Sequence, residues 1–397
     1  MSTQSWLRAG FRAGLSCEES RHDCRLAGKT ACPTMLCLVL CAAALFAQDK
    51  PRARDLGVPF DGAPGPLNAI TDVAGIEVGH STIIRDPGVR TGVTVVWPRG
   101  KSNSDSAFAG WFSLNGNGEM TGTTWIEESG FLDTPVMITN THSVGAVRDG
   151  YIQWQVANKR KQFAFSLPVV AETYDGFLND TDGFHVKQEH VAAALEGARG
   201  GRVTEGSVGG GTGMICYGFK GGIGTASRKA GAYTVGVLVQ CNCGRRDQLT
   251  IAGVPVGREI GNAAVAQNQP GIREDVGSII IVIATDAPLL PHQLKRLARR
   301  ATMGLARTGS TSGNGSGDIF IAFSTANAGA AKITGVQDLK MLPNDQMNGL
   351  FGATVEATEE SIVNAMVGAE TMTGFQGHQI IALPHDRVRA ALRKYNK

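Results

Sequence analysis

Cysteine is scarce in this 397-residue chain once its first 48 residues are set aside. Five of the eight cysteines fall within those residues, and only Cys216, Cys241 and Cys243 follow them. An odd number of cysteines without CxxC spacing implies neither a disulfide framework nor a zinc site. We therefore expect these three residues to be small thiols buried in strands.

The chain also lacks an excess of charge of one sign, because it has 38 basic and 35 acidic residues. A net charge of +3 leaves no basic surplus of the kind that indicates nucleic-acid binding. The densest basic cluster, Lys295, Arg296, Arg299 and Arg300, is better explained as the solvent-facing side of a helix. We expect no nucleic-acid partner.

Long hydrophobic runs are missing as well. The apolar run Met35–Ala47 has 13 residues, whereas a membrane-spanning helix needs about 20. Basic residues precede this run and polar residues follow it, which is typical of a secretory signal peptide. We predict that residues 1–48 form a leader cut near Ala47 or Gln48, and that the mature protein is exported to the periplasm or secreted, without a stable membrane span.

Two alternatives remain open at the leader. The segment before Met35 is long for a signal peptide, so translation could start at Met35. Leu38–Cys41 resembles a lipoprotein box, although a bulky leucine stands where a small residue is expected.

Several well-known catalytic motifs are absent. No GxGxxG follows a predicted strand, and neither GxxxxGK[ST] nor GxSxG occurs. HExxH is absent, and His185 and His190 are five residues apart, which does not suit a metal pair on one helix face. We expect no metal and no organic cofactor. A Ser-His-Asp triad assembled from distant residues remains possible, with His142, His292 or His385 as its base.

Glycine is abundant, with 52 residues interspersed among short β-branched segments, which favours many tight turns in a folded domain. Predicted strands and helices come in groups, which favours antiparallel sheets covered by helices over a doubly wound parallel sheet. The predicted strands are 69–73, 75–79, 92–97, 135–139, 233–241, 278–285 and 318–324. The predicted helices are 144–157, 185–198, 257–267, 291–307 and 358–371.

In the stretch around Ser278, a serine stands directly before a predicted buried strand. Residues 279–285 are almost all β-branched, and the polar segment 267–275 before them is of the kind that is open to cleavage. Cleavage between Gly277 and Ser278 would give Ser278 a free α-amine, whose ordinary pKa of about 7.7 to 8.0 suits a general base. One residue could then supply both nucleophile and base. An ordinary loop-to-strand junction is the simpler alternative.

A second candidate segment is the Gly/Ser-rich stretch 308–318, which leads directly into the apolar residues 319–323. A flexible linker is one interpretation. A tight loop held against the core is the other, and such a loop can direct hydroxyls and backbone amides at a reacting group, with Asp318 anchoring the hydrogen bonds.

These segments together resemble the DmpA-type aminopeptidases, the P1 or S58 peptidase family of L-aminopeptidase/D-esterases and β-peptidyl aminopeptidases. The resemblance is carried by Gly277–His292, Gly309–Phe320, Val239–Gly244, Asn68–His80, Asn140–Gly145 and Glu172–Gly176. It implies an α+β fold, a four-layer αββα sandwich like that of N-terminal nucleophile hydrolases with its own connectivity. It also implies one peptidase domain, 49–397, that cleaves itself into an α-chain, 49–277, and a β-chain, 278–397.

The resemblance further implies roles for particular residues. Ser278 would be the nucleophile and Asn242 a donor to the oxyanion. Ser316 and Asp318 would orient the amine and hydroxyl of Ser278. Glu172 would bind the substrate's ammonium group, with Tyr174 near the leaving amide or oxyanion. The cysteines on either side of Asn242 and the acidic residue at 318 differ from some members of the family, which leaves substrate preference open.

The sequence therefore predicts an exported, self-processing serine aminopeptidase that removes N-terminal residues from small peptides, aminoacyl amides or esters through an acyl-enzyme on Ser278. The resemblance implies a homo-oligomer of αβ heterodimers. Two alternatives are a self-cleaving acyltransferase of related architecture, whose relatives use a threonine nucleophile, and a secreted binding protein whose chain stays intact.

Overall fold

The computed structural model describes residues 50–161, 163–261 and 277–397. The predicted leader, all but Gly277 of the predicted processing segment and the second half of the predicted helix 257–267 lie outside the described residues. None of the described helices is long and apolar enough to cross a bilayer.

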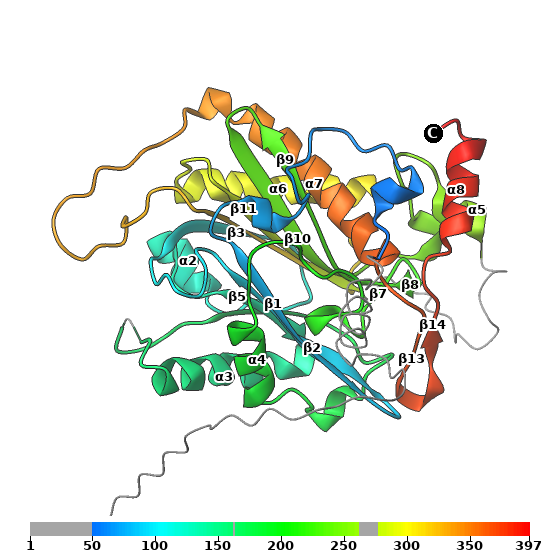
Figure 1. The fold of residues 1–397 in the computed structure, drawn as a ribbon, viewed down its shortest axis with the longest axis horizontal. Coiled ribbons are helices and arrows are strands. Elements are labelled where there is room, and N and C mark those ends of the chain that lie inside the picture. The colour runs from blue at the N-terminus through cyan, green and yellow to red at the C-terminus, as the bar shows by residue number, and fades with distance from the viewer. Residues whose placement is uncertain (1–49, 162, 262–276) are drawn as a thin grey trace, which may run out of the picture. The chain divides into compact units, whose positions relative to one another are not determined.

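Two β-sheets form the middle of residues 50–397 (Figure 1). Both are mixed sheets. The four-stranded sheet has the order β1 (Glu77–Arg85), β2 (Val89–Trp97), β5 (Val136–Asn140) and β6 (Val169–Thr173). The six-stranded sheet has the order β4 (Phe131–Leu132), β3 (Ala107–Gly116), β12 (Gly317–Ser324), β11 (Ser278–Thr285), β10 (Tyr233–Asn242) and β9 (Gly222–Ala230).

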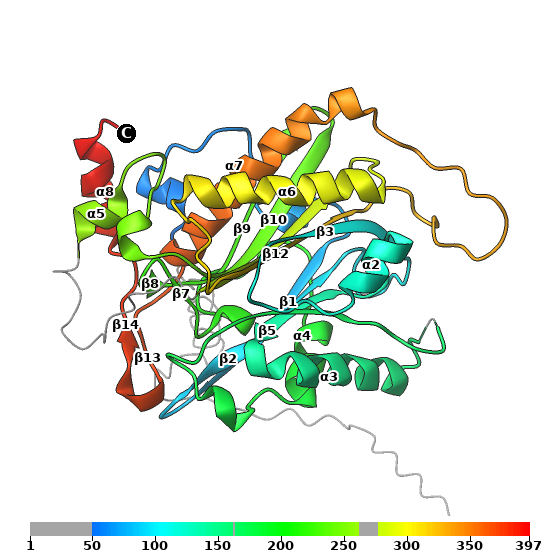
Figure 2. The ribbon, with the colours of Figure 1, turned by 180° about the vertical axis from the view of Figure 1, so that it is seen from behind.

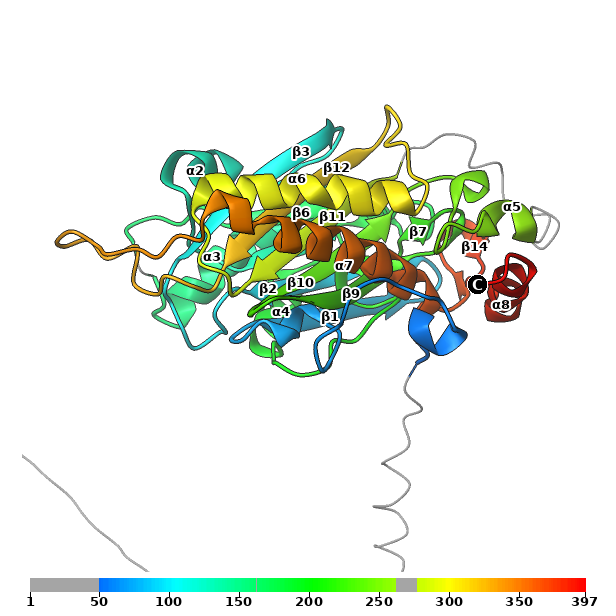
Figure 3. The same cartoon turned by 90° about the horizontal axis from the view of Figure 1, so that it is seen from above.

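Helices cover the outer face of each sheet, which gives four layers (Figures 1 and 2). α6 (Pro291–Arg307) and α7 (Asn348–Val367) lie side by side on the six-stranded sheet, as the view from above also shows (Figure 3). α3 (Val144–Ala157) and α4 (Gln188–Glu196) pack on the four-stranded sheet. This is the αββα sandwich expected from the family resemblance.

Shorter elements connect and flank the layers. The remaining α-helices are α2 (Thr123–Ser129), α5 (Val256–Ile260) and α8 (His385–Lys394). Two small hairpins are β7 (Ile215–Cys216) with β8 (Phe219–Lys220), and β13 (Met372–Thr373) with β14 (Gln379–Ile380). The 3₁₀-helices are η1 (Ala53–Leu56), η2 (Ile70–Asp72), η3 (Thr141–Ser143), η4 (Thr181–Gly183), η5 (Gly209–Gly211), η6 (Arg246–Gln248), η7 (Asn344–Gln346) and η8 (Phe375–Gly377).

Strand β11 is buried on both faces, which explains its unbroken apolar sequence. Ile279, Ile281 and Ile283 pack into the cluster that includes α6 and α7. Ile280 and Val282 alternate with them and pack between the two sheets. A third cluster fills the space between the four-stranded sheet and helices α3 and α4. β11 is therefore held from both sides, which fixes the position of Ser278 at its start.

The predicted helices 144–157 and 291–307 are confirmed at both ends, and 185–198 is α4 with shorter bounds. The apolar side chains on one face of α6 are all buried, namely Leu294, Leu297, Ala298, Ala301 and Leu305. The predicted start of the last long helix at 358 is wrong, because α7 begins at Asn348. Gly349 and Gly352 obscured its first turns, whereas buried Leu350 and Ala353 hold them against the core.

Two further expectations need correction. The predicted strand 69–73 contains the 3₁₀-helix η2, in which Asp72 accepts backbone hydrogen bonds from Leu67 and Ala69. The sheets are not purely antiparallel, because β5 pairs with β6, and β11 with β12, in parallel. Each parallel pair is connected through a helix, α3 or α6, so these segments are crossover units within otherwise antiparallel sheets.

Candidate active site

Three neighbouring strands of the six-stranded sheet bring the candidate residues together at one end of the sheet, where these strands begin or end. β10 ends at Asn242, which is paired in register with Ser278 at the start of the antiparallel strand β11. β12 runs parallel to β11 on its other side, and Ile279 is in register with Asp318. Asn242, Ser278 and Asp318 therefore lie at the ends of adjacent strands, although 76 residues separate the first from the last in the sequence.

The hydroxyl of Ser278 is buried and is held by the backbone of β12. Ser278 is 4% exposed, and its Oγ accepts a hydrogen bond of 3.1 Å from the backbone N–H of Gly317. Gly317 is tightly packed, since a Cβ at this position would lie 2.4 Å from the carbonyl oxygen of Asn117. Only glycine brings its N–H to this place, and the contact fixes the direction in which the Ser278 hydroxyl points.

Ser316 and Asp318 flank Gly317, Ser316 just before β12 and Asp318 on it. Both are buried, and the Ser316 hydroxyl donates a hydrogen bond of 2.6 Å to Oδ1 of Asp318. The Gly/Ser-rich stretch before them is a loop held against the body of the domain, because Asn115 donates side-chain hydrogen bonds to the carbonyls of Ser312 and Gly313. The linker interpretation is therefore wrong.

The side-chain amide of Asn242 is fixed at both ends. Its Oδ1 accepts a hydrogen bond of 2.8 Å from the backbone N–H of Ile215, on β7. Its Nδ2 donates one hydrogen bond of 2.9 Å to the carbonyl of Tyr174. An amide nitrogen carries two hydrogens, so the second is available for another acceptor. This is the arrangement that a preorganised donor to an oxyanion requires.

Gly277 is pressed against the end of β10. A Cβ at this position would lie 2.0 Å from the carbonyl oxygen of Asn242 and 2.8 Å from Cα of Cys243. The Gly277–Ser278 bond therefore lies directly beside the Asn242 segment. A glycine before Ser278 is what this close approach allows.

Glu172 belongs to the other sheet and is buried. Among the described residues no lysine or arginine forms a salt bridge with it, and His142 is near enough to lower its pKa. It is 3% exposed, and Oε1 accepts a hydrogen bond of 3.0 Å from the N–H of Glu119, while Oε2 accepts one from the Thr141 hydroxyl. Burial raises the pKa of Glu172, and the two hydrogen bonds oppose this effect. Such a carboxylate can bind an incoming ammonium group.

Gly118 connects Glu172 with the loop that holds Ser278. A Cβ built on Gly118 would lie 3.0 Å from Cα of Gly317 and 3.2 Å from Oε1 of Glu172. Gly118 therefore lies next to both the Glu172 carboxylate and the Gly317 backbone.

Tyr174 lies at the mouth of the site. It is half-exposed, and its ring lies over Gly176, where a Cβ would come within 2.1 Å of the Tyr174 hydroxyl. Within the described part of the chain this hydroxyl makes no hydrogen bond to Ser278 or Asn242. Tyr174 therefore contacts the site through its backbone carbonyl, which accepts the hydrogen bond from Asn242. Its side chain lines a cavity.

That cavity, of about 290 Å³, opens beside the Gly277–Ser278 bond. Asn242, Gly277 and Tyr174 line it together with residues from two other segments, 215–218 and 375–378. The full lining is Tyr174, Gly176, Phe177, Ile215, Gly218, Asn242, Cys243, Gly244, Gly277, Phe375, Gln376 and His378.

A buried lysine supports the hairpin that holds Asn242. Lys220 is fully buried, and its Nζ donates hydrogen bonds of 2.8 and 3.0 Å to the carbonyls of Met214 and Gly221. These bonds close the β7–β8 hairpin next to Ile215. Burial lowers the pKa of Lys220 to about 7, with the charge of Asp175 opposing the shift. Asp175 is itself buried, and desolvation raises its pKa to about 6.

The three cysteines form no disulfide and are buried; Cys216 and Cys241 lie in strands, as expected, and Cys243 follows the end of β10. Cys216 and Cys243 lie with their sulfurs 3.5 Å apart, and burial raises the pKa of Cys241. Within the residues that the structure describes, no cluster of His, Cys, Asp or Glu side chains could hold a metal ion. His142 instead pairs with Asp182, and His385 with the carbonyl of Val367, so neither contacts Ser278 in the described structure.

Sequence reasoning missed four features of the site. These are the Gly317 N–H, the hydrogen bonds from Thr141 and Glu119 to Glu172, the lysine behind the hairpin, and the cavity wall from residues 375–378. Backbone donors and a buried lysine leave no sequence motif. The glycines that flank Ser316 were a signal, since close backbone approach requires them.

The fold and the site define a class of protein: a hydrolase with a variant of the N-terminal nucleophile fold, in which two sheets lie between two helical layers. The family described as "Peptidase family S58" matches residues 68–380. This chain belongs to that peptidase family and is an aminopeptidase.

Curated relatives and solved structures agree. The chain is 52% identical over 387 residues to the β-peptidyl aminopeptidase BapA of Sphingosinicella microcystinivorans, covering 92% of this chain and 97% of the relative. It is 47% identical to the protein of that name from Sphingosinicella xenopeptidilytica, covering 91% and 96%. The solved structure of the L-aminopeptidase D-Ala-esterase/amidase from Ochrobactrum anthropi, a prototype for the serine aminopeptidases, matches with a TM-score of 0.81 and 49% identity over 87% of this chain and 99% of that one. The β-aminopeptidase of a Burkholderia species matches with a TM-score of 0.79 and 48% identity over the same shares.

Proposed function

We propose that this aminopeptidase cleaves its own chain before Ser278 and then hydrolyses small peptides, aminoacyl amides or esters through an acyl-enzyme on that serine. The single observation that carries the proposal is the convergence of Asn242, Ser278 and Gly317 at the ends of three adjacent strands, beside a cavity and a buried carboxylate.

Self-cleavage would begin when Oγ of Ser278 attacks the carbonyl carbon of Gly277. The bond to the Ser278 nitrogen breaks, that nitrogen takes up a proton, and an ester links Gly277 to Oγ. Water then hydrolyses the ester, leaving a carboxylate on Gly277 and a free amine on Ser278. The hydrogen bond from Gly317 N–H orients Oγ, and the close contact of Gly277 with Asn242 holds the bond in place.

In catalysis the new amine of Ser278 would take the proton from its own hydroxyl as Oγ attacks the substrate carbonyl. The second hydrogen of Asn242 Nδ2 would stabilise the oxyanion. The amine leaving group departs with a proton from the Ser278 ammonium, and water then releases the N-terminal residue as an acid. The Ser316–Asp318 pair lies next to Gly317 and would hold the amine in position.

Glu172 would restrict the enzyme to substrates with a free N-terminus. Its buried carboxylate forms no salt bridge with a lysine or arginine of the described residues, so a substrate ammonium would pair with it, whereas an acylated amine would leave it without that ion pair. Tyr174 would contact the leaving amide or the oxyanion from the cavity side.

We also propose export of the mature protein and assembly of αβ units into a homo-oligomer. The composition of residues 1–48 supports the first. Support for the second comes from the segment between β12 and α7, which projects as an arm in Figures 1 and 3. On this arm Ile333 and Val336 are 91% and 99% exposed, which is costly for large apolar side chains in a monomer.

The experiment is hydrolysis of an aminoacyl 4-nitroanilide and of its N-acetylated form by the wild type, Ser278→Ala and Ser102→Ala. Ser102 is an exposed loop serine and serves as the matched control. We expect the wild type and Ser102→Ala to hydrolyse only the free-amine substrate, and Ser278→Ala to lose at least about 10³-fold in rate. Activity of purified Ser278→Ala at the wild-type level would contradict the proposal.

A further inference from the structure

A single peptide unit connects the buried Lys220 with Asn242. The carbonyl of Met214 and the N–H of Ile215 belong to the same planar amide. Nζ of Lys220 donates a hydrogen bond of 2.8 Å to this carbonyl, and the N–H donates one of 2.8 Å to Oδ1 of Asn242. The lysine and the asparagine therefore lie at opposite ends of one amide.

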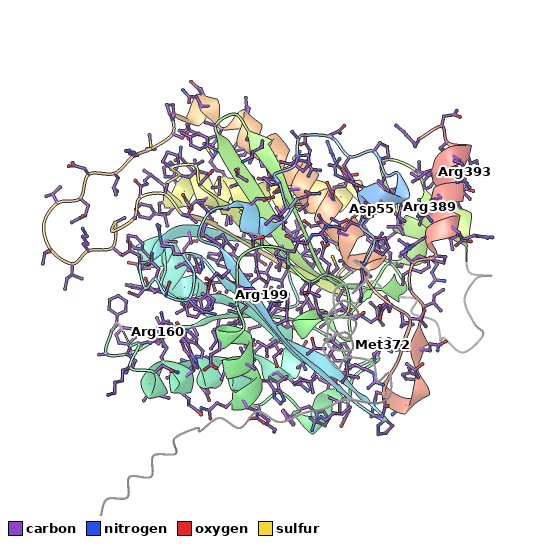
Figure 4. The ribbon with its side chains drawn as sticks, viewed as in Figure 1. Asp55, Arg160, Arg199, Met372, Arg389 and Arg393 are labelled. Atoms are coloured by element: carbon purple, nitrogen blue, oxygen red, sulfur yellow. The ribbon has the colours of Figure 1, made fainter. Side chains whose placement is uncertain are left out.

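The hairpin β7–β8 holds this chain of hydrogen bonds in place. Ile215 on β7 is paired in register with Lys220 on β8. The backbone N–H of Lys220 donates a hydrogen bond of 2.8 Å to the carbonyl of Ile381, directly after β14. Figure 4 labels Met372, where the hairpin β13–β14 begins. Both hairpins thus fix the lysine close to the candidate site.

Hydrogen bonds that share an amide strengthen one another, by about 10–30% per bond. A donor on the carbonyl oxygen draws electron density from the amide nitrogen, which makes the N–H of that amide a better donor. A cationic donor such as an ammonium group has about twice the effect of a neutral one. The Asn242 side chain is itself an amide, so a stronger bond at its Oδ1 makes the hydrogens on its Nδ2 better donors.

A lysine is costly at this place, because it is fully buried and forms no salt bridge with a carboxylate of the described residues. Burial lowers the pKa of Lys220 to about 7. The charges of Asp175 and Cys216 oppose this shift, and that of Lys50 adds to it. Buried groups with shifted pKa values are typical of functional sites.

We infer that Lys220 is a positioning residue for the reaction: through the Met214–Ile215 peptide, its ammonium group orients the Asn242 amide and strengthens the hydrogen bond that this amide donates to the oxyanion. The inference rests on the proposed function, in which Asn242 Nδ2 stabilises the oxyanion. Within the described part of the chain Lys220 makes no hydrogen bond to Ser278. It therefore acts on the reaction through Asn242, and loss of its charge weakens the oxyanion donor without removing it.

The first test is a double-mutant cycle, measured as hydrolysis of an aminoacyl 4-nitroanilide per cleaved molecule at pH 6.5. Lys220→Met should lower kcat by about 10-fold, less than the roughly 10²- to 10³-fold loss expected when an oxyanion donor is removed, and should leave KM within about twofold. In the Asn242→Ala background the same substitution should change kcat by less than about twofold, because the chain of hydrogen bonds then ends before the oxyanion.

Two further variants make the comparison secure. Lys220→Gln keeps N–H donors for the hairpin but carries no charge, so it should also lower kcat, and it replaces Lys220→Met if that variant does not fold. Lys229→Met is the matched control, because Nζ of Lys229 bonds to the Thr234 hydroxyl at the other end of β9. It should leave kcat and KM unchanged.

The second test follows the ratio of wild-type kcat to Lys220→Met kcat from pH 6 to 8.5. The Ser278 amine titrates in both proteins and cancels in this ratio. Lys220 is charged below its folded pKa of about 7 and loses its proton above it. The ratio should therefore be largest at pH 6 and fall by at least about threefold toward pH 8.5.

Wild-type kcat in both Lys220→Met and Lys220→Gln would overturn the inference and leave the proposed function intact, provided that Asn242→Ala is impaired. An equal loss from Lys220→Met in the wild-type and Asn242→Ala backgrounds would overturn it as well, because the lysine would then act only on the fold. So would a ratio that stays constant over the pH range in which Lys220 titrates. Full activity of purified Asn242→Ala would instead contradict the oxyanion role in the proposed function, and the inference with it.

Discussion

Both polar atoms of the Asn242 side chain are held by hydrogen bonds to the backbone. Ile215 N–H fixes its oxygen, and the carbonyl of Tyr174 takes one of its two amide hydrogens. The remaining hydrogen needs no rearrangement to meet a developing oxyanion, which is why such donors contribute so much to catalysis.

Asn242→Asp should lower kcat by about 10²- to 10³-fold. The aspartate can still accept from Ile215 N–H, but a carboxylate offers no hydrogen to the oxyanion or to the carbonyl of Tyr174. The measurement is steady-state hydrolysis per cleaved molecule, with the extent of self-cleavage determined on the same sample. Near wild-type kcat in cleaved Asn242→Asp would contradict the assigned role.

Lys220 gives the domain a pH-dependent stability. Burial lowers its pKa from 10.5 to about 7 in the folded state, so between these values the unfolded chain binds a proton that the folded chain does not. Stability should therefore increase as pH rises from 7 toward 10, with a slope of up to about 1.4 kcal/mol per pH unit from this group.

In Lys220→Met this contribution should be absent. The comparison uses urea unfolding at pH 7.5 and 9.5 in the Ser278→Ala background, which keeps a single chain in both proteins. The free energy of unfolding of the lysine-containing protein should rise relative to that of the methionine variant between the two pH values. A constant difference would show that Lys220 keeps an ordinary pKa.

At the scale of elements, the site depends on the pairing of β10 with β11 and on glycines that let backbones meet. Gly277 is the sharpest case, because its Cβ position is occupied by the Asn242 carbonyl. In the proposed mechanism its role would end with cleavage, because Gly277 would then be a chain terminus.

Gly277→Ala should slow self-cleavage by about 10²-fold, because the methyl group displaces the scissile carbonyl by roughly an ångström. Once cleaved, the variant should turn over substrate like the wild type. The measurement is a time course of cleavage on denaturing gels, together with kcat of the cleaved fraction. Gly352→Ala is the control, because nothing lies within 4 Å of its Cβ position. Cleavage of Gly277→Ala at the wild-type rate would show that the close contact is unimportant.

The elements differ in how well the sequence predicts them. Strand β11 and helix α6 carry strong periodic patterns and are correct at both ends. The strands β3, β6 and β9 were not predicted from the sequence, since glycine or polar residues interrupt their patterns. The parallel pairing of β11 with β12 depends on tertiary contacts that no local pattern encodes.

In the site, too, some features could be predicted from the sequence and others depend on tertiary contacts. The candidate side chains could be named from the family resemblance, and the structure places Ser278, Asn242, Ser316 and Asp318 at neighbouring strand ends. Their backbone partners and the cavity wall at 375–378 arise from segments remote in sequence, so only the folded chain reveals them.

At the scale of the whole described domain, cleavage before Ser278 would not separate the two products. β10 of the first product stays hydrogen-bonded to β11 of the second. Arg228 and Glu360, one on each side of the cut, form a fully buried ion pair of 2.7 Å, and Arg54 joins Glu360 at 2.8 Å. Removing one partner of a buried pair costs about 3 to 5 kcal/mol, so these contacts strongly favour an intact αβ unit.

The arm between β12 and α7 should act as a contact between such units. We expect Ile333→Asp combined with Val336→Asp to lower the molar mass in solution by light scattering, while activity per unit is largely retained. Ile84→Asp, which adds a charge at an exposed apolar residue of β1, is the matched control. An unchanged molar mass in the arm variant would show that these residues face solvent in the assembled protein.

The central claim is that Ser278 cuts its own chain and becomes a new N-terminus. The most direct measurement is intact mass and N-terminal sequencing of the denatured wild type beside Ser278→Ala. Two fragments, with the smaller beginning Ser-Ile-Ile-Ile-Val, and a single uncut chain in Ser278→Ala are the predicted results. An uncut chain in a fully active wild type would contradict the mechanism proposed for Ser278.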